Sequence, residues 1–251
     1  MTKINICALS DTHNKHNRLT LKPGDLLIHA GDFSGMGYPW EQERFIEWLK
    51  KQPYTAKVII AGNHEKGVEA DEFTFKQMCK EAGIVYLHDS SVELQFVGSY
   101  VYIDQNIPDL PKIKIHGSPW TPYFFNWAFN AARYKELESQ HGTWIKNHWD
   151  MIPEDTDILV THGPPYQILD ELVFVDGTPK GEFVGCQELL KRIQEVKPDL
   201  HIFGHIHIHG GCEKHQDGVS YYNAAICDEM YMPTNKIHYI EYTKELDANK
   251  P

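Results

Sequence analysis

Five short apolar runs, each ending in polar residues suited to metal binding or acid–base chemistry, constrain the fold of this chain more than any other feature. The run ends are Ser10-Asp11-Thr12-His13, Gly31-Asp32, Gly62-Asn63-His64-Glu65, Thr161-His162-Gly163 and Gly204-His205-Ile206-His207. One such junction arises by chance, but five in one chain indicate a common plan. In layered α/β proteins, ligands bind at the carboxyl ends of strands. The pattern therefore predicts an α/β protein with one site built from several strand ends.

The length and the cysteine pattern limit the class of protein. The 251 residues suit one large domain, and we expect residues 1–251 to form it. The apolar runs are strand-sized, so no membrane span is expected, and the start of the chain shows no leader. Five cysteines without a Cys-x-x-Cys pair favour reduced thiols in a cytoplasmic protein and argue against a Cys-ligated zinc site. Cys7 and Cys186 lie in apolar segments and are expected in the core.

The charge balance excludes one class of partner. The formal net charge is −11, and no cluster of Lys and Arg is large enough to form the basic face of a duplex nucleic-acid binder. An acidic chain also repels an anionic substrate unless bound cations compensate locally. We therefore expect no duplex nucleic acid as a partner.

Two helices are predicted in the first third of the chain. Pro39–Lys50 has a proline in its first turn, early acids and a late lysine, which the helix dipole favours. Phe45, Trp48 and Leu49 fall on one face of it and should pack on a sheet. Asp71–Lys80 is the second predicted helix.

The middle of the chain changes character. Residues 91–116 alternate apolar and polar side chains in short runs, which predicts an antiparallel addition to a second sheet. The block Tyr123–Asn130 then holds five large aromatic residues beside two prolines. Such a block serves equally well as core, as the rim of a substrate pocket or as a subunit interface.

The last third returns to alternating helices and strands. Residues 134–148 favour a helix weakened near Gly142, and residues 166–185 are expected to form an irregular loop. The spacing of apolar residues over Cys186–Val196 predicts a helix that ends at Lys197-Pro198. Strands are expected at 200–203, 219–223 and 237–242.

The junction residues suggest a metal centre. Carboxylate, imidazole and amide oxygen ligands together suit divalent ions such as Mn, Fe or Zn. The candidates are Asp11, His13, Asp32, Asn63, His162, His205 and His207. Seven are too many for one catalytic ion with an open position, but fit two ions that share a carboxylate about 3.5–4 Å apart. Two such cations polarise phosphoryl oxygens and lower the pKa of a bound water, so that hydroxide forms at neutral pH.

The ordered series Asp-x-His, Gly-Asp, Gly-Asn-His-Glu, His and Gly-His-x-His resembles the calcineurin-like metallophosphoesterase family, and spans residues 11–207. Leu159–Pro165, Gly117–Trp120 and Trp127–Asn130 are similar to the metallophosphoesterase-domain-containing branch known from animal brain and from bacteria. That branch is associated with metal-dependent phosphodiesterase activity, including activity on cyclic nucleotides. Some animal members have lost one histidine of Gly-His-x-His, whereas this chain keeps both.

The resemblance implies a fold and a role for each residue. The fold would be a four-layer αββα sandwich of two mixed β-sheets. Asp32 would bridge two metal ions, and His64 would protonate the leaving alkoxide or stabilise the transition state. The remaining ligands would divide into Asp11, His13 and His207 for the first ion, and Asn63, His162 and His205 for the second.

Each residue also has an ordinary interpretation. Asp11 and Asp32 could cap turns, Asn63 could be a turn residue and His162 a satisfied buried imidazole. Other histidines match no motif, although His29 precedes Gly31-Asp32 and is a candidate to support a ligand. Arg133, after the aromatic block, suits a surface position better than a phosphate contact.

Three functions fit this pattern. The first is a phosphodiesterase for small diesters, with cyclic nucleotides among the candidates. The same centre would serve a phosphomonoesterase or protein phosphatase, and a weakly active metal-binding regulatory protein is a third alternative. The expected partner is a small phosphoester substrate, with no membrane, and a homodimer remains open.

Overall fold

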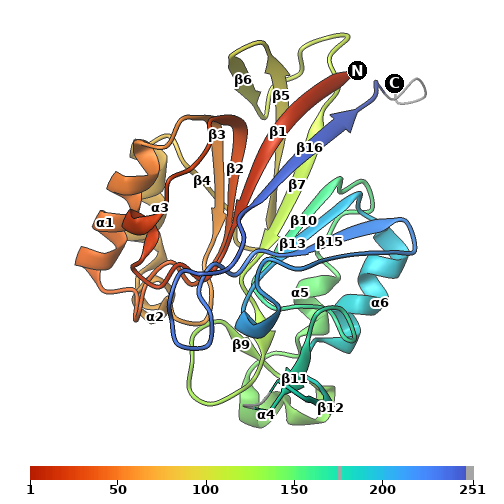
Figure 1. Ribbon diagram of the computed structural model, residues 1–251. Coiled ribbons are helices and arrows are strands. Elements are labelled where there is room, and N and C mark those ends of the chain that lie inside the picture. Colours follow the sequence, from red (N-terminus) through yellow and green to blue (C-terminus); the bar gives the residue numbers. More distant parts are fainter. Residues whose placement is uncertain (175–176, 247–251) are drawn as a thin grey trace.

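Two mixed β-sheets stack face to face with helices on both outer sides (Figure 1). The structure is a computed structural model that describes residues 1–174 and 177–246. The first sheet has the strand order β16-β1-β2-β3-β4. Its strands are β1 (Thr2–Leu9), β2 (Gly24–Ala30), β3 (Tyr54–Ile60), β4 (Val85–Tyr86) and β16 (His238–Lys244).

The second sheet has the order β14-β15-β13-β10-β7-β5-β6. Its strands are β5 (Ser90–Val97), β6 (Tyr100–Ile103), β7 (Ile113–Ser118), β10 (Ile158–Thr161), β13 (Leu200–Phe203), β14 (Glu213–Gln216) and β15 (Val219–Asn223). Neighbours run parallel from β1 to β4 and from β7 through β10 and β13 to β15. As predicted, residues 91–116 add antiparallel strands to this second sheet.

The core explains the layers. Along β1, Ile4 and Ile6 face the second sheet, while Cys7 and Leu9 face the helices on the other side. This alternation follows from the two-residue period of a strand. The predicted four-layer αββα sandwich is confirmed, because β10 and β13 divide their residues in the same way between the inter-sheet core and the second helical layer.

The helices on the outer face of the first sheet begin at predictable residues. Those helices are α1 (Pro39–Lys50), α2 (Lys66–Ala70) and α3 (Glu72–Glu81). At the start of α1, the Glu41 carboxylate accepts a hydrogen bond from the backbone N–H of Tyr38 at 2.8 Å. Phe45, Trp48 and Leu49 are buried against the sheet, as predicted. The side chain of Asp71 caps α3.

The second helical layer is less regular than predicted. The helix expected over residues 134–148 is wrong, because a short 3₁₀ turn (Lys135–Leu137), α4 (Glu138–His141) and α5 (Lys146–Trp149) replace it. Gly142 adopts φ 83°, which ends α4, and the Ile145 N–H donates to Ala132 O instead of a helical carbonyl. The predicted helix at 186–196 is present as α6 (Gln187–Val196), with Lys197 left-handed at its end.

The expected irregular loop over residues 166–185 is also wrong. It contains a hairpin of β11 (Glu171–Val173) and β12 (Pro179–Phe183), joined through an irregular register. The Asp170 carboxylate ties the hairpin down by accepting from the N–H groups of Gln167 and Gly185. A second small pair, β8 (Thr121–Pro122) and β9 (Asn130–Ala131), brackets the aromatic block.

The five cysteines are free thiols, and Cys7 and Cys186 are buried in the core as predicted. No helix within the described ranges combines the length and the apolar character needed to cross a membrane.

Candidate metal centre

The candidate site lies where the parallel strands of the two sheets end. β1, β2 and β3 of the first sheet lead to Asp11 and His13, to Asp32, and to Asn63 and His64. β10 and β13 of the second sheet lead to His162 and to His205 and His207. Hydrogen bonds join the two sheets here, since the Asp11 carboxylate accepts from the His205 N–H at 2.9 Å.

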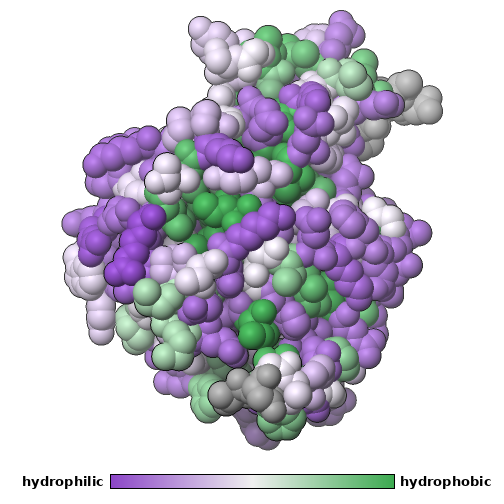
Figure 2. Space-filling view, in the orientation of Figure 1, coloured by the Kyte–Doolittle hydropathy of each residue, from purple (hydrophilic) through white to green (hydrophobic). Residues whose placement is uncertain are grey.

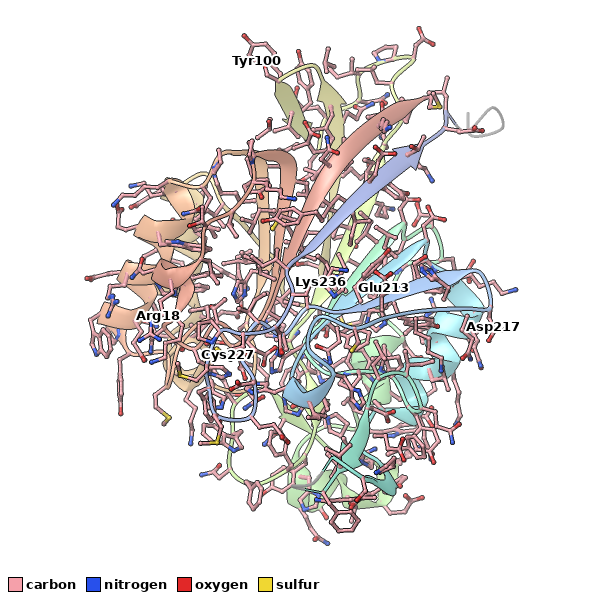
Figure 3. All side chains as sticks on the ribbon, in the orientation of Figure 1. Arg18, Tyr100, Glu213, Asp217, Cys227 and Lys236 are labelled. Atoms are coloured by element: carbon pink, nitrogen blue, oxygen red, sulfur yellow. The ribbon has the colours of Figure 1, made fainter. Side chains whose placement is uncertain are left out.

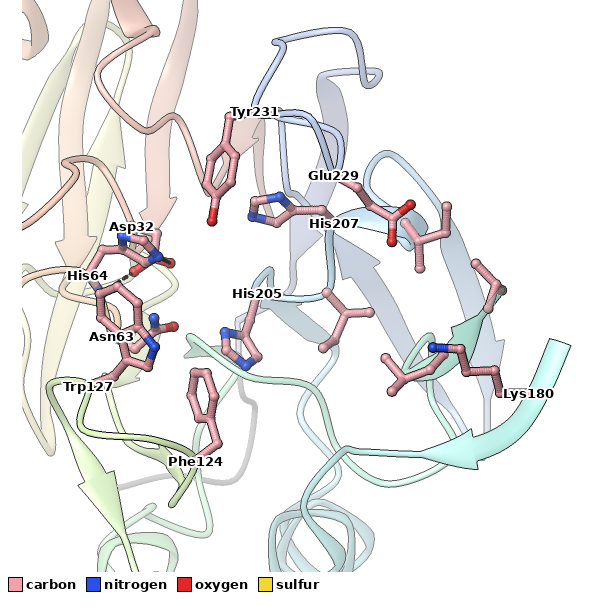
Figure 4. Close-up of a pocket in the computed structure, with 14 residues that line it drawn as sticks. Asp32, Asn63, His64, Phe124, Trp127, Lys180, His205, His207, Glu229 and Tyr231 are labelled. Carbon is pink, nitrogen blue, oxygen red and sulfur yellow. Dashed lines mark hydrogen bonds and ion pairs between the residues drawn. The ribbon is translucent and has the colours of Figure 1, made fainter. Parts of the chain in front are cut away.

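All seven predicted ligands and His64 lie together in the structure. Figure 4 shows Asp32, Asn63, His64, His205 and His207 of this set. Ligand atoms lie within 4.8 Å of one another in three groups: Asp11, His13 and His207; His13, Asp32 and His64; and Asp32, His162 and His205. Asn63 joins the last group, because its Oδ1 accepts from His162 Nε2 at 2.9 Å. Asp32 belongs to two groups, which is the position of a carboxylate that two ions share.

The imidazoles are oriented in one common way. Each of four rings has its Nδ1 within hydrogen-bond distance of a backbone carbonyl, which leaves Nε2 directed at the centre. The pairs are His13 with Ser34, His64 with Gly35, His162 with Ala30, and His207 with Asp228, at 2.8–3.2 Å. Metal-binding histidines are usually held through their other nitrogen in this manner. The second sphere of contacts therefore prepares these rings for coordination through Nε2.

Short approaches between candidate ligand atoms mark the centre. His13 Nε2 lies 3.2 Å from His207 Nε2, and His207 Nε2 lies 3.2 Å from Asp11 Oδ1. His162 Nε2 is 3.3 Å from Asp32 Oδ2. Nitrogen and carboxylate oxygen atoms that converge in this way form a donor set suited to divalent cations.

The backbone is strained at four of the site residues. Asp11, His13, Asp32 and His205 have φ between 38° and 69°, in the left-handed region. Each such residue costs of order 1–3 kcal/mol, and such strain clusters at functional sites. The sharp turns direct side chains back over the strand ends.

Glycine precedes three of the ligands because the ligand side chains pack against it. A Cβ on Gly62 would overlap Asp32 Oδ1, and a Cβ on Gly204 would overlap Asp11 Oδ2. The pairs Gly-Asn and Gly-His in the sequence thus report close approach of a carboxylate from a neighbouring strand end.

Glu65 is a site residue to which the sequence interpretation gave no role. Its buried carboxylate accepts from the backbone N–H groups of Asp32 at 2.8 Å, Ser34 at 3.0 Å and Gly62 at 2.7 Å. It therefore ties the loop after β2 to the loop after β3. Its place in Gly-Asn-His-Glu was the available signal. Burial raises the pKa of Glu65 to about 8, and the negative charge of Asp32 acts in the same direction.

Burial and charge pairing divide the histidines into two kinds. Burial lowers the pKa of His13 to about 4 and that of His205 to about 3, so both rings are neutral at pH 7. For His162 burial also acts downward, but the charge of Asp32 outweighs it and raises the pKa to about 10. Burial opposes ionisation of Asp32 as well, yet His162 and His64 hold its pKa well below the ordinary value. A divalent cation would take over the role that the proton on His162 plays here.

His29 and Arg133 lie outside the cluster of candidate ligands and make different kinds of contact. His29 is fully buried, and its Nε2 lies 3.0 Å from Thr12 Oγ1, between Asp11 and His13. Arg133 donates to the carbonyls of Val184 and Gly185 at 2.7–2.8 Å and so anchors the end of the β11–β12 hairpin.

A cleft of about 330 Å³ opens beside the cluster, which is the size of a small ligand site. The aromatic block divides between two of its three expected roles. Phe124 and Trp127 line the cleft, whereas Phe129 is buried in the core. The sequence did not place Tyr231, Leu172 or Val173 at the cleft, because Tyr231 comes from a loop and the other two from the short strand β11, and neither segment has a recognisable pattern.

Known proteins resemble this chain in sequence. Residues 4–209 match the calcineurin-like phosphoesterase family. The chain is 38% identical over 239 residues to Metallophosphoesterase domain-containing protein 1 of Homo sapiens, covering 90% of this chain and 67% of that protein. It is 35% identical over 222 residues to UPF0046 protein T07D4.2 of Caenorhabditis elegans, covering 83% of this chain and 52% of that protein.

Among solved structures, phosphopantetheinyl hydrolase of Mycobacterium tuberculosis has a similar fold. The TM-score is 0.56 at 14% identity, covering 94% of this chain and 95% of that one. The predicted resemblance is thus confirmed. The chain belongs to the calcineurin-like phosphoesterase family, whose members hydrolyse phosphoesters with the help of divalent metal ions.

Proposed function

We propose that this protein is a phosphodiesterase that hydrolyses small diesters, cyclic nucleotides among them, with two divalent ions at the site. The buried carboxylate of Asp32 carries the proposal, because it belongs to two of the three groups of ligand atoms and the third group shares His13 with one of them. Asp11, His13 and His207 would hold one ion, and Asn63, His162 and His205 the other, with Asp32 between them. Such a pair of ions supplies Lewis acidity and a water of lowered pKa.

His64 is the proposed acid. Its Nδ1–H donates to Gly35 O at 2.8 Å, and its ring stacks on Trp127 with the centroids 4.3 Å apart. These contacts fix the ring so that Nε2 faces the cleft, 4.0 Å from Asp32 Oδ2. A proton held at Nε2 is placed for donation to the oxygen of the leaving alcohol.

The charges of the cleft support a diester over a monoester. Among the fourteen residues that line it, Lys180 is the one Lys or Arg, and it lies across the cleft from Asp32 and His64 (Figure 4). A monoester dianion would gain from further cations near the centre, whereas a diester carries one negative charge and a second organic group. The apolar side chains of the cleft suit that second group.

Metal analysis tests the centre. Reconstitution with Mn²⁺ should give about two ions per chain. Elemental analysis that finds one ion or none in folded protein at saturating metal would remove the two-ion proposal.

A substrate panel tests the reaction. The manganese-loaded protein should hydrolyse bis-p-nitrophenyl phosphate and 2′,3′- or 3′,5′-cyclic nucleotides faster than p-nitrophenyl phosphate. The reverse order would identify a phosphomonoesterase, and no turnover of either class by protein that holds two ions would favour a regulatory protein.

A further inference from the structure

We propose that the cleft binds the hydrocarbon chain of an amphiphilic phosphodiester, which lies along an aliphatic wall formed by Leu172, Val173, Ile206 and Ile208. The proposal rests on the phosphodiesterase function above and names the class of substrate for the same site. The four side chains line the cleft together with Asp32, Asn63 and His64.

The wall is continuous with the candidate metal centre. His205, Ile206, His207 and Ile208 follow one another after β13, so candidate ligands alternate with aliphatic side chains. Leu172 and Val173 of β11 extend the wall toward β12, where Pro179 pairs with Val173 and Lys180 follows. A phosphate at the centre therefore has an aliphatic surface directly beside it.

The wall itself suits a hydrocarbon chain better than a nucleobase. All four wall residues are aliphatic, and the polar residues that line the cleft besides the candidate ligands and His64 are Lys180, Glu229 and Tyr231. Sites that recognise a polar ring place a few polar groups around it. The aromatic residues are partly engaged, since Trp127 stacks on His64 and Phe124 packs against His205 with the centroids 5.0 Å apart.

Three large exposed hydrophobic residues are neighbours in sequence of residues that line the cleft. Phe125 (79% exposed), Phe174 (54%) and Met230 (80%) each adjoin a residue that lines the cleft, namely Phe124, Val173 and Tyr231. Single exposed hydrophobic residues are common, but three on segments that all line one cleft support an apolar ligand there. Figure 2 shows hydrophobic residues among polar ones over the lower half of the molecule, which in Figure 1 holds the loop after β15 and the β11–β12 hairpin.

The exposed ring of Phe125 is held in place. Phe125 has φ 47°, a conformation that is unfavourable for a bulky residue. The Asn130 side-chain amide donates to the carbonyls of Phe124 at 3.1 Å and Phe125 at 3.3 Å, which stabilises the turn. The loop thus maintains a conformation that keeps an aromatic ring in water, and a bound amphiphile would cover that ring.

The position of the hydrocarbon chain on the wall determines which ester group stays on the phosphorus. His64 lies across the cleft from Lys180 of the β11–β12 hairpin (Figure 4), so an alcohol that leaves on the side opposite the hairpin would face His64. The oxygen of water joins phosphorus, the P–O bond to the leaving alcohol breaks, and that alcohol departs with a proton. The product that stays on the wall is a phosphate monoester that carries the chain.

Two diesters with the same leaving group test the wall. Methyl p-nitrophenyl phosphate and octyl p-nitrophenyl phosphate differ in seven methylenes, each worth up to about fourfold in affinity when fully buried. Because the wall is open, we expect KM at least about tenfold lower for the octyl ester, with kcat within about threefold. Binding of octyl and ethyl methylphosphonate, measured by calorimetry, should show the same preference without turnover.

Substitutions in the wall test whether it causes the preference for the octyl ester. Leu172 and Val173 lie outside the core clusters, and Leu172→Ser and Val173→Ser should each raise KM for the octyl ester toward that for the methyl ester and so remove most of the octyl preference. Tyr100→Ser is the control, because Tyr100 is a large hydrophobic residue exposed to water at the opposite end of the molecule (Figure 3). It should keep the full preference.

Three results would overturn the proposal: equal KM for both esters, a preference that survives both wall substitutions, or a preference that Tyr100→Ser also removes. A lower KM for thymidine 5′-p-nitrophenyl phosphate than for the octyl ester, lost in Leu172→Ser, would assign the wall to a nucleoside instead. If the methyl ester is not hydrolysed at all, the proposed function fails, and the calorimetric comparison still decides whether the wall binds a chain.

Discussion

The two sides of the cleft differ in how the chain positions them. On the metal side, the candidate ligands follow directly after strands, and five of the seven are buried: Asp11, His13, Asp32, Asn63 and His162. On the rim side, Phe124, Leu172 and Tyr231 come from a loop, a two-stranded hairpin and a second loop, and none belongs to the two large sheets. The metal side is thus held by the strands of the two large sheets, whereas the rim consists of loops and a hairpin outside those sheets. Mutations should therefore affect chemistry on one side and selectivity or stability on the other.

The largest effect is expected at the residue that both groups of ligands share. Asp32→Asn keeps the size of the side chain but removes the negative charge between the two ion positions. Losing the charge stabilisation of two cations costs several kcal/mol, so the rate should fall about 10⁴-fold, below detection in most assays. Asn63→Ala removes one neutral ligand of one ion and should cost about 10–100-fold. Kinetics with metal analysis of both variants would decide, and equal, mild losses would show that Asp32 is not shared.

This metal side could be predicted from sequence, for a physical reason. A strand end needs only a few residues to place a side chain, so ligand and strand lie within one short motif. Gly62 and Gly204 strengthened the motif because a carboxylate packs where their Cβ would be. The two sheets were predictable in the same way, since their two-residue period records which face is buried.

The rim could not be predicted, because its contacts lie far apart in sequence. The expected helix at 134–148 failed because the Ile145 N–H bonds to Ala132 O rather than within a helix. The hairpin at 171–183 is held by Asp170 and by Arg133, about forty residues earlier, and such a partner leaves no periodic pattern. Glu65 is an intermediate case, since its motif was visible but its three N–H donors were not.

The second effect separates catalysis from metal binding within the metal side. His64→Ala should leave the metal content unchanged and lower kcat about 10³-fold on a diester with an alkoxide leaving group. The loss should shrink for p-nitrophenolate, which departs without a proton. Rates on both substrates, with elemental analysis, check this. The structure also places His64 within 4.8 Å of ligand atoms of His13 and Asp32, so loss of metal in the variant would make it a ligand instead of an acid.

A smaller effect is expected from the residue that joins two ligand loops. Glu65→Gln presents an NH₂ group where one carboxylate oxygen accepts backbone N–H groups, and so weakens the link between the loops after β2 and β3. Metal affinity should fall about 10–100-fold, as it does when groups behind metal ligands are changed. Calorimetric titration with Mn²⁺ measures it. The exposed Glu43→Gln on α1 serves as the control. An identical Mn²⁺ affinity for both variants would show that the ligand loops keep their conformation without the Glu65 carboxylate.

The smallest effect on the reaction, and the sharpest contrast with the metal side, is expected where the rim joins the core. The Asp89 carboxylate accepts from Ser118 Oγ at 2.7 Å, Trp120 Nε1 at 2.9 Å and His148 Nδ1 at 2.7 Å, and Trp120 leads into the loop that carries Phe124 and Trp127. Burial opposes ionisation, but the hydrogen bond from His148 and the other donors lower the pKa of Asp89 overall. Because its pKa is lower in the folded than in the unfolded protein, this carboxylate stabilises the fold above its ordinary pKa near 3.8, and the stabilisation is lost as the pH falls through the folded value.

Asp89→Asn should therefore lower the free energy of unfolding by about 1.5–3 kcal/mol equally at pH 7 and pH 5, and the difference from the unmodified protein should narrow below about pH 4. Asp150→Asn, which breaks an exposed ion pair with Lys146 on α5, should cost less than about 1 kcal/mol. Urea titrations across this pH range measure both, alongside kcat on methyl p-nitrophenyl phosphate, which should change less than about threefold because no candidate ligand contacts Asp89. A large loss of kcat or of bound metal in Asp89→Asn would mean that rim and metal side are coupled, and the contrast between them would not hold.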